Sequence, residues 1–327
     1  MVEQVMTIRQ ALNGALHQTM ADDDTIICIG EDIAENGGVF GVTEGLVGKF
    51  GAARVIGTPI SETAFVGMGA GAAMTGLKPV VELMFCDFAG VCFDQIMNQA
   101  AKARFLSNGR LKLPLVIRTT MGAGDGSGAM HSASLHSLFA SVAGLTVVCP
   151  STPADAAGLL KAAIRSDGPV VFMENKHLYD VEGPVEDGMP EISIGRARIV
   201  LAGEDVSIVA VSAMVQQALA AANNLNKKSI SVEVIDPLTV KPLDIGAITK
   251  SVRKTGRLLV VDEGAAFAGF ADAVISAVSE QAFGSLRAAP RKLCAPDIPV
   301  PYAPAAEQRW LPDSNDIVQA VTRMMEA

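Results

Sequence analysis

One acidic side chain stands among apolar neighbours in the segment TPISETAF, residues 58–65. If Glu62 is buried there, loss of hydration raises its pKa, and its carboxyl group can hold or share a proton near neutral pH. The same pattern is typical of a helix start, where a glutamate after Ser61 binds free backbone amides. The residue types alone leave both interpretations open.

A histidine follows a glycine-rich segment. His131 comes three residues after Gly128, which closes the run Gly122–Gly128. A histidine on such a loop can exchange protons with a substrate near pH 7, but it can equally serve only to satisfy nearby hydrogen-bonding groups. The stretch VVELMFCDF, residues 80–88, is typical of a strand that ends in an aromatic pair, and by itself it predicts core packing.

Within the glycine-rich segment, Gly124-Asp125-Gly126 matches the start of the element with which thiamine diphosphate enzymes hold Mg²⁺ and the diphosphate. In those enzymes an Asn-Asn pair closes the element. Here the pair is missing from the matching position, since Asn223 and Asn224 lie in a different predicted domain. We therefore expect a flexible loop that lines a site, in a chain that cannot hold the diphosphate alone.

Several other motifs fail. The stretch Gly67–Ala73 is rich in small residues but lacks the GxGxxG spacing and does not follow a strand, so it predicts close helix packing rather than a dinucleotide loop. The chain contains no GxxxxGK[ST], no GxSxG and no HExxH. These absences count against a P-loop, an α/β-hydrolase and a zinc protease.

Short apolar runs alternate with stretches of helical spacing. Because the runs are continuous rather than alternating, they predict a parallel sheet buried on both faces. A threonine, a proline and an acid at Thr152, Pro153 and Asp155 predict a helix start. The expected strands of the first half are 25–29, 79–84, 113–118, 145–148 and 169–173, and its expected helices include 93–105 and 153–164.

A second β/α series begins after the segment EGPVEDGMP, residues 182–190, whose glycine, prolines and acids predict a linker. The expected strands are 197–201, 206–211, 231–235 and 258–261, with helices at 215–225, 245–255 and 271–283. We therefore predict two α/β domains, residues 1–186 and 190–327, each doubly wound around a mainly parallel sheet.

Composition narrows the class of protein. The 327 residues carry a net charge of −9 and are 50% hydrophobic, which predicts large cores and disfavours nucleic acid and anionic membrane as partners. No apolar run is long enough to span a membrane, and the amino terminus lacks the pattern of a secretory signal. Five scattered cysteines without CxxC spacing predict neither a zinc site nor a disulfide framework, and they favour the cytoplasm.

Taken together, the motifs resemble one family over essentially the whole chain. It is the β subunit of the E1 component of thiamine diphosphate-dependent 2-oxo acid dehydrogenase complexes. The stretch VVELMFCDFAGVCFDQI looks most like acetoin dehydrogenase β subunits. The resemblance implies a transketolase-like pyrimidine-binding domain followed by a transketolase C-terminal domain. The matching segments, in the family's order, are GEDIAENGGVFGVTEGL, TPISE, VVELMFCDFAGVCFDQIMNQAAK, the GxxHS loop, PSTPADAAGLLKAAIR and PVVFMENKHLY.

The resemblance assigns roles to five residues. Glu62 matches the glutamate that hydrogen-bonds N1′ of the thiamine aminopyrimidine, Phe88 matches the aromatic residue stacked on that ring, and Met84 matches the side chain beside it. Ile60 matches an apolar pocket residue, and His131 matches the histidine near the thiazolium and substrate. In some members backbone carbonyls hold a structural K⁺, and the matching positions are Leu115, Ala163, Ile164, Ser166 and Gly168.

The same resemblance implies an activity and partners. The expected reaction is cleavage of acetoin and transfer of the two-carbon unit to a lipoyl group on an E2 acyltransferase, with pyruvate or a branched-chain 2-oxo acid as the alternative substrate. An E1 α subunit is expected to supply the Mg²⁺ and diphosphate ligands in an α₂β₂ assembly, with the second domain contributing β–β and E2 contacts. Ala133 replaces the family's usual glutamine in His-Ser-Gln, which leaves a non-catalytic scaffold subunit as a further alternative. A self-sufficient thiamine enzyme and a nicotinamide dehydrogenase are two more.

Overall fold

A computed structural model describes residues 3–326. The chain forms two compact units. Of the described residues, the first unit holds 3–121 together with Leu138–Ile194, and the second holds Gly122–Ser137 together with 195–326. The segment that carries His131 therefore belongs to the second unit, although it interrupts the first in the sequence. No sequence pattern indicates that exchange, and the functional boundaries at 186 and 190 remain a prediction.

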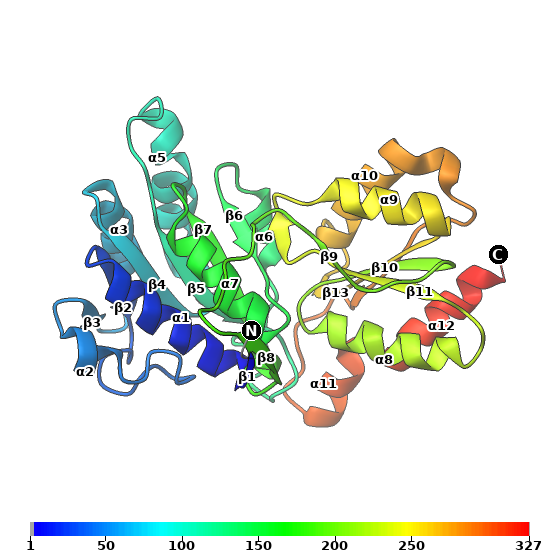
Figure 1. The fold of residues 1–327 in the computed structure, drawn as a ribbon, viewed down its shortest axis with the longest axis horizontal. Coiled ribbons are helices and arrows are strands. Elements are labelled where there is room, and N and C mark those ends of the chain that lie inside the picture. Colours follow the sequence, from blue (N-terminus) through cyan, green and yellow to red (C-terminus); the bar gives the residue numbers. More distant parts are fainter. Residues whose placement is uncertain (1–2, 327) are drawn as a thin grey trace. The chain divides into compact units, whose positions relative to one another are not determined.

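The first unit is an α/β layer structure whose main sheet has the order β6-β7-β5-β4-β2-β3 among its own strands, all neighbours being parallel (Figure 1). The strands are buried along most of their length, which confirms the parallel sheet covered on both faces. Its elements are β1 (Glu3–Thr7), α1 (Ile8–Asp22), β2 (Ile26–Gly30), α2 (Leu46–Phe50), β3 (Val55–Gly57), α3 (Glu62–Met74), β4 (Lys78–Phe85), η1 (Cys86–Phe88), α4 (Ala89–Asp94), η2 (Gln95–Ala100), α5 (Ala101–Leu106), β5 (Val116–Met121), β6 (Thr146–Val148), α7 (Pro153–Ile164), β7 (Val170–Asn175), η3 (Lys176–Leu178) and β8 (Glu182–Glu186).

The second unit has a sheet of order β14-β13-β10-β11-β9, parallel except for β9 at one edge. Side chains of α8, α12 and the sheet form one apolar core, while α9 and α10 pack on the other face (Figure 1). Its elements are β9 (Arg198–Leu201), β10 (Val206–Ala210), α8 (Met214–Asn226), β11 (Val232–Asp236), β12 (Thr239–Lys241), α9 (Ile245–Thr255), β13 (Leu258–Ala265), α10 (Phe270–Ala282), η4 (Phe283–Ser285), β14 (Arg291–Ala295), α11 (Pro304–Trp310) and α12 (Ser314–Met325). Helix α6 (His136–Ser141) begins at the end of the segment 122–137.

Three predictions about local structure need correction. Residues 182–186 of the expected linker form strand β8, because their backbone pairs antiparallel with β1. The expected helix 93–105 is divided among α4, the π-helix η2 and α5. The expected strand 113–118 starts only at Val116, since Pro114 has no backbone N–H to donate to a sheet.

Two other predictions are confirmed. Helix α7 begins at Pro153, and the side chain of Thr152 accepts a hydrogen bond from the Asp155 amide. The small residues after Glu62 lie inside helix α3, where Gly69 permits close packing: a Cβ there would lie 2.5 Å from Cγ2 of Val81. Within residues 3–326, the structure has no helix with the length and apolar character needed to cross a bilayer.

Candidate active site

Glu62 is the first residue of helix α3 and is only 8% exposed. The segment before it is tied to the end of β2, because the Thr58 amide donates to the Gly30 carbonyl at 2.9 Å. Amides of the next turn donate to the Ser61 carbonyl, while the Ser61 hydroxyl turns away to the Pro59 carbonyl. Glu62 is thus both buried and at a helix start, so the structure combines the two interpretations that the sequence left open, and ordinary helix and strand backbone positions it.

A second carboxyl group, which was not predicted from the sequence, lies near Glu62. Glu31 follows directly after β2, is buried, and its Oε1 has no hydrogen-bond partner among residues 3–326. Burial raises the pKa of Glu31, the nearby charge of Glu62 raises it further, and a hydrogen bond with the Ser61 backbone opposes the rise. The position was detectable, because ligands of parallel sheets gather at the carboxyl ends of strands.

Aromatic side chains gather at the end of β4. The rings of Phe85 and Phe88 meet edge to face, with their centroids 5.5 Å apart. Helix α3 packs against α4, and the hydroxyl of Thr63 donates to the Val91 carbonyl at 2.7 Å. This contact joins the residue after Glu62 to the helix that begins directly after Phe88.

The remaining residues predicted for this part of the site differ in exposure. Met84, near the end of β4, is half-buried like Phe88. Ile60 is 84% exposed, so on this chain it is not part of an enclosed apolar pocket.

His131 lies in the segment Gly122–Ser137, which we call the histidine loop. Its amide donates to the Gly128 carbonyl at 3.3 Å, and its side chain is half-buried. The loop has no regular structure before α6, and Gly122, Gly124, Gly126 and Gly128 all have positive φ angles. This conformation explains the glycines, since other residues adopt it only with strain.

The Gly-Asp-Gly motif binds a side chain of its own unit. The amides of Gly124 and Gly126 donate to the two carboxylate oxygens of Glu307, at 2.7 and 2.9 Å. Glu307 lies on α11 and is 1% exposed. Asp125 is exposed, and its carboxylate accepts from the Ser127 amide at 3.2 Å. These two amides therefore already hold an anion.

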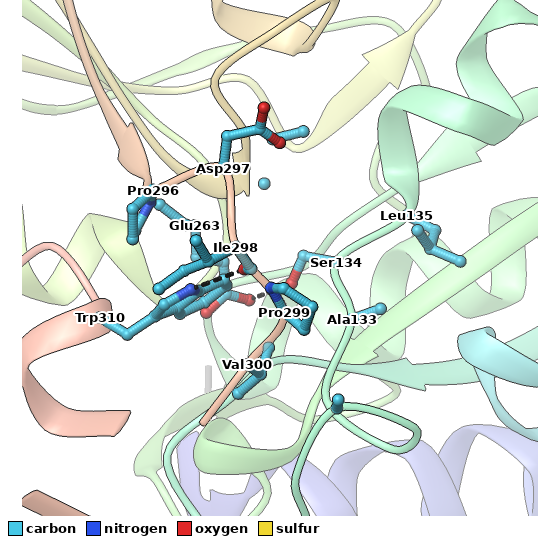
Figure 2. A pocket seen from close by; sticks show the side chains of 14 residues that line it. Ala133, Ser134, Leu135, Glu263, Pro296, Asp297, Ile298, Pro299, Val300 and Trp310 are labelled. Carbon is cyan, nitrogen blue, oxygen red and sulfur yellow. Dashed lines mark hydrogen bonds between the residues drawn. The ribbon is translucent and has the colours of Figure 1, made fainter. Parts of the chain in front are cut away.

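The far end of the histidine loop is also held. Ser134 donates to Glu263 at 2.9 Å, Nε2 of His136 lies 2.9 Å from Oδ2 of Asp262, and the Ser137 hydroxyl accepts from the amide of residue 270 at 2.8 Å. Figure 2 shows Ser134 and Glu263 joined across one side of a cavity of about 370 Å³. The cavity is lined by loop residues, by the chain around Pro296–Val300 and by Trp310.

The positions predicted to hold K⁺ fall into two neighbouring segments of the first unit. Leu115 precedes β5, and its carbonyl accepts from the Val170 amide at 2.9 Å. Ala163 and Ile164 end helix α7, where the Ala163 carbonyl accepts from the Ser166 amide. The Gly168 amide donates to the Ser166 hydroxyl at 3.3 Å. The structure brings these segments side by side, and K⁺ binding stays a prediction.

Comparison with known proteins defines the class. The family model described as "Transketolase, pyrimidine binding domain" matches residues 4–182, and "Transketolase, C-terminal domain" matches residues 195–317. A solved structure titled "Split gene transketolase, inactive beta4 tetramer" has a TM-score of 0.81 and 25% identity, covering 98% of each chain. The chain is thus a two-domain transketolase-like α/β protein, as the sequence predicted.

Curated relatives narrow the family. Subunit beta of acetoin:2,6-dichlorophenolindophenol oxidoreductase from Cupriavidus necator is 45% identical, covering 98% of both chains. The same subunit from Bacillus subtilis is 41% identical, covering 98% of this chain and 97% of that one. The pyruvate dehydrogenase E1 component subunit beta from Rickettsia felis is 42% identical, again covering 98% of both. The chain belongs to the family of β subunits of thiamine diphosphate-dependent E1 dehydrogenases, and the predicted resemblance is confirmed.

Proposed function

We propose that this chain is the β subunit of an E1 enzyme that cleaves acetoin and passes the two-carbon unit to a lipoyl group on E2. Two relatives that cover nearly the whole chain carry acetoin in their names, at 45% and 41% identity, and the pyruvate dehydrogenase subunit from Rickettsia felis lies between them at 42%. Pyruvate is therefore the alternative substrate, and a branched-chain 2-oxo acid is less favoured.

The single observation that carries the proposal is the buried Glu62 carboxyl at the start of α3, beside a buried Glu31 oxygen that lacks a partner among the described residues. An aminopyrimidine offers N–H donors and a ring nitrogen, so these two carboxyl groups fit it chemically. In our proposal Glu62 binds the ring nitrogen, Phe88 and Met84 supply apolar contact, and Ile60 becomes covered when the α subunit binds.

When bound, thiamine diphosphate would supply a carbon nucleophile for a carbonyl group and an electron sink for the C–C bond that breaks. In our proposal the chain's residues prepare that chemistry. Glu62 holds a proton on its carboxyl oxygen and shares it with the pyrimidine nitrogen. Phe88 and Met84 exclude water, which strengthens this hydrogen bond in a low-dielectric site. His131 donates a proton to the oxygen of the substrate or to the sulfur of the lipoyl group.

The diphosphate end is assigned to a partner. The Gly124 and Gly126 amides bind Glu307, and no Asn-Asn pair stands at the matching position in the sequence, so we propose that an E1 α subunit supplies the Mg²⁺ and diphosphate ligands in an α₂β₂ assembly. We assign pyrimidine binding to residues 1–186, and subunit and E2 contacts to residues 190–327. A K⁺ held by backbone carbonyls near Ser166 is part of the proposal. Five free thiols favour the cytoplasm.

The test replaces Glu62 with glutamine in the enzyme assembled with its α partner. We expect Glu62→Gln to lower turnover more than about a hundredfold, because the proton is no longer shared with the ring nitrogen. Exposed Glu280 of α10 provides the control, and Glu280→Gln should leave turnover unchanged. Near-normal activity of Glu62→Gln would refute the assigned role.

Substrate choice and cofactor sharing need separate measurements. Rates with acetoin, pyruvate and branched 2-oxo acids, compared as kcat/KM, decide between the main proposal and its alternatives. Purified β chain should show no tight, magnesium-dependent thiamine diphosphate binding, and such binding would support a self-sufficient enzyme. A scaffold subunit would show no loss of rate in His131→Ala, whereas the proposed enzyme loses activity.

A further inference from the structure

The histidine loop is held at both ends by buried charged side chains that lie far away in the sequence. We propose that Glu307, together with the His136–Asp262 pair, acts as a set of positioning residues that fix the loop and thereby orient His131. The inference rests on the proposed function of His131. It assigns a role to three residues that do not themselves touch the reacting atoms.

Glu307 holds the amino-terminal part of the loop. Its carboxylate accepts two backbone N–H bonds, and hydrogen bonds to an ionised acceptor are stronger than neutral ones. A flexible, glycine-rich segment loses much backbone entropy when it is ordered, so it needs such contacts to adopt one conformation. Tyr302 adds packing, since a Cβ on Gly128 would lie 3.2 Å from its ring.

The His136–Asp262 pair holds the other end. His136 is fully buried, and Nε2 is 2.9 Å from Oδ2 of Asp262 on β13. Gly264 leaves the space that the ring occupies, because a Cβ there would lie 2.8 Å from Cε1 of His136. Nδ1 has no hydrogen-bond partner among the described residues, so the Asp262 contact is the polar link that fixes this ring.

The surroundings of His136 determine its ionisation. Burial lowers the pKa of His136, but the charge of Asp262, the hydrogen bond between them and the charge of Glu263 outweigh burial and raise it. Both carboxyl groups lie on β13, and Cys294 of β14 pairs in register with Asp262. On α10 the neighbour is the Phe270 ring, whose centroid is 6.3 Å from that of the imidazole.

The geometry connects these anchors to His131. Along the chain, His131 lies between the Gly126 amide held by Glu307 and the Ser134 hydroxyl bound to Glu263. Its own amide donates to the Gly128 carbonyl inside the held stretch. Loss of either anchor releases one end of the loop and so displaces His131. Even a small displacement of a catalytic group lowers the rate of the catalysed reaction strongly.

The first experiment measures loop order without cofactor or activity. Amide hydrogen exchange of the full β chain, assembled with its α partner, is compared for wild type, Glu307→Gln and Asp297→Asn. Glutamine accepts with only one oxygen, so exchange at Gly124 and Gly126 should rise at least about tenfold while the sheet amides stay protected. Asp297 is an exposed carboxylate that lines the same cavity, and its variant should match wild type. Unchanged exchange in Glu307→Gln would overturn the proposal.

The second experiment asks whether the anchors act through His131. In the assembled enzyme, Glu307→Gln should lower kcat between about tenfold and a hundredfold, with a smaller change in substrate KM and unchanged cofactor affinity. Combined with His131→Ala, it should cause no further loss, because both changes remove the same contribution. Fully additive losses would overturn the link to His131.

A further pair of variants separates positioning from folding. His136→Gln keeps an N–H donor for Asp262, and His136→Leu removes it, so glutamine should restore most of the exchange protection and rate that leucine loses. Equal losses of exchange protection and rate in the two variants would contradict the positioning role of the His136–Asp262 pair. If wild type has no turnover with any tested substrate, the proposed function fails, and the exchange measurement still decides whether the anchors hold the loop.

Discussion

The two units use buried charge in opposite ways. In the first unit, Arg118 of β5 lies between Glu82 of β4 and Glu174 of β7, and donates to them at 2.6 to 2.8 Å. The two glutamates lie on the two strands that pair directly with β5. In the second unit, Glu307 binds backbone amides of a loop segment that has no strand or helix, and Asp262 binds His136 at the first residue of the short helix α6.

This difference suggests that the buried charges of the first unit affect the stability of that whole unit, whereas those of the second unit affect the position of one loop. The Arg118 cluster lies inside a sheet that backbone hydrogen bonds already specify, and Tyr179 completes it by donating to Glu174 at 2.7 Å. Breaking this cluster leaves charge in the core and weakens the whole unit. Breaking a loop anchor leaves the surrounding sheet paired, so its effect should appear in local opening and turnover.

The largest effect on stability is expected from Arg118→Met. The substitution leaves Glu82 and Glu174 buried without their cation, which should lower the free energy of unfolding by about 3–5 kcal/mol. Urea unfolding followed by circular dichroism measures the loss. The control is Arg110→Met, an exposed arginine, which should change stability by less than about 0.5 kcal/mol. A loss for Arg118→Met below that of Glu307→Gln would reverse the comparison.

A smaller effect is expected at the helix that carries Glu62. In Gly69→Ala the new Cβ meets Val81, so α3 must move away from β4, and stability should fall by about 1–3 kcal/mol. In Gly71→Ala nothing lies within 4 Å of the new Cβ, and the better helix former should stabilise by up to about 1 kcal/mol.

The melting temperatures and turnover rates of the two alanine variants test whether packing positions Glu62 in the first unit, in contrast to the polar anchors that position the loop in the second. Gly69→Ala should also lower activity, because it displaces Glu62 through packing rather than through a polar anchor. If the two variants have the same melting temperature, packing against Val81 does not determine the position of α3.

The smallest effect is expected at a partly exposed pair in the first unit. Asp23 binds Lys78 at 2.8 Å, and hydrogen bonds from Lys78 and Thr25 lower the pKa of Asp23 from 3.8 to about 2. Because the folded-state pKa is lowered, the stabilisation is present above pH 3.8 and fades as the pH falls toward 2.

Asp23→Asn should therefore cost up to about 1 kcal/mol at pH 7, the upper range for a solvent-accessible pair. Its unfolding curve should approach that of wild type near pH 2, since the wild-type aspartate is then almost fully protonated in the unfolded chain and about half protonated in the folded one, which leaves little of the stabilisation. A difference that stays constant between pH 7 and pH 2 would show that the charge is not responsible.

Where structure depends on neighbours in sequence, it was predictable. Thr152, Pro153 and Asp155 lie within four positions and specify the start of α7 through backbone geometry and one hydrogen bond. Continuous apolar runs indicated the parallel sheets, and the apolar neighbours of Glu62 made its burial one of two open interpretations. The ordered family motifs added the class of cofactor.

Contacts over long separations were not predictable. Glu307 binds an amide 183 positions earlier, and His136 meets an aspartate 126 positions later. Neither residue carries a local pattern, because any glutamate on a short helix looks the same in sequence. Strand β8 was missed for the same reason, since its partner β1 lies at the other end of the unit.

The assignment of residues 122–137 to the second unit limits how the polypeptide can be divided. A cut in the stretch 187–189 would produce an amino-terminal fragment that contains His131 but has lost Glu307 and Asp262. The complementary fragment would retain both acids and have no loop to bind. Truncated, fused or domain-exchanged versions of the protein therefore need to keep the histidine loop together with Glu307 and Asp262 in the same polypeptide.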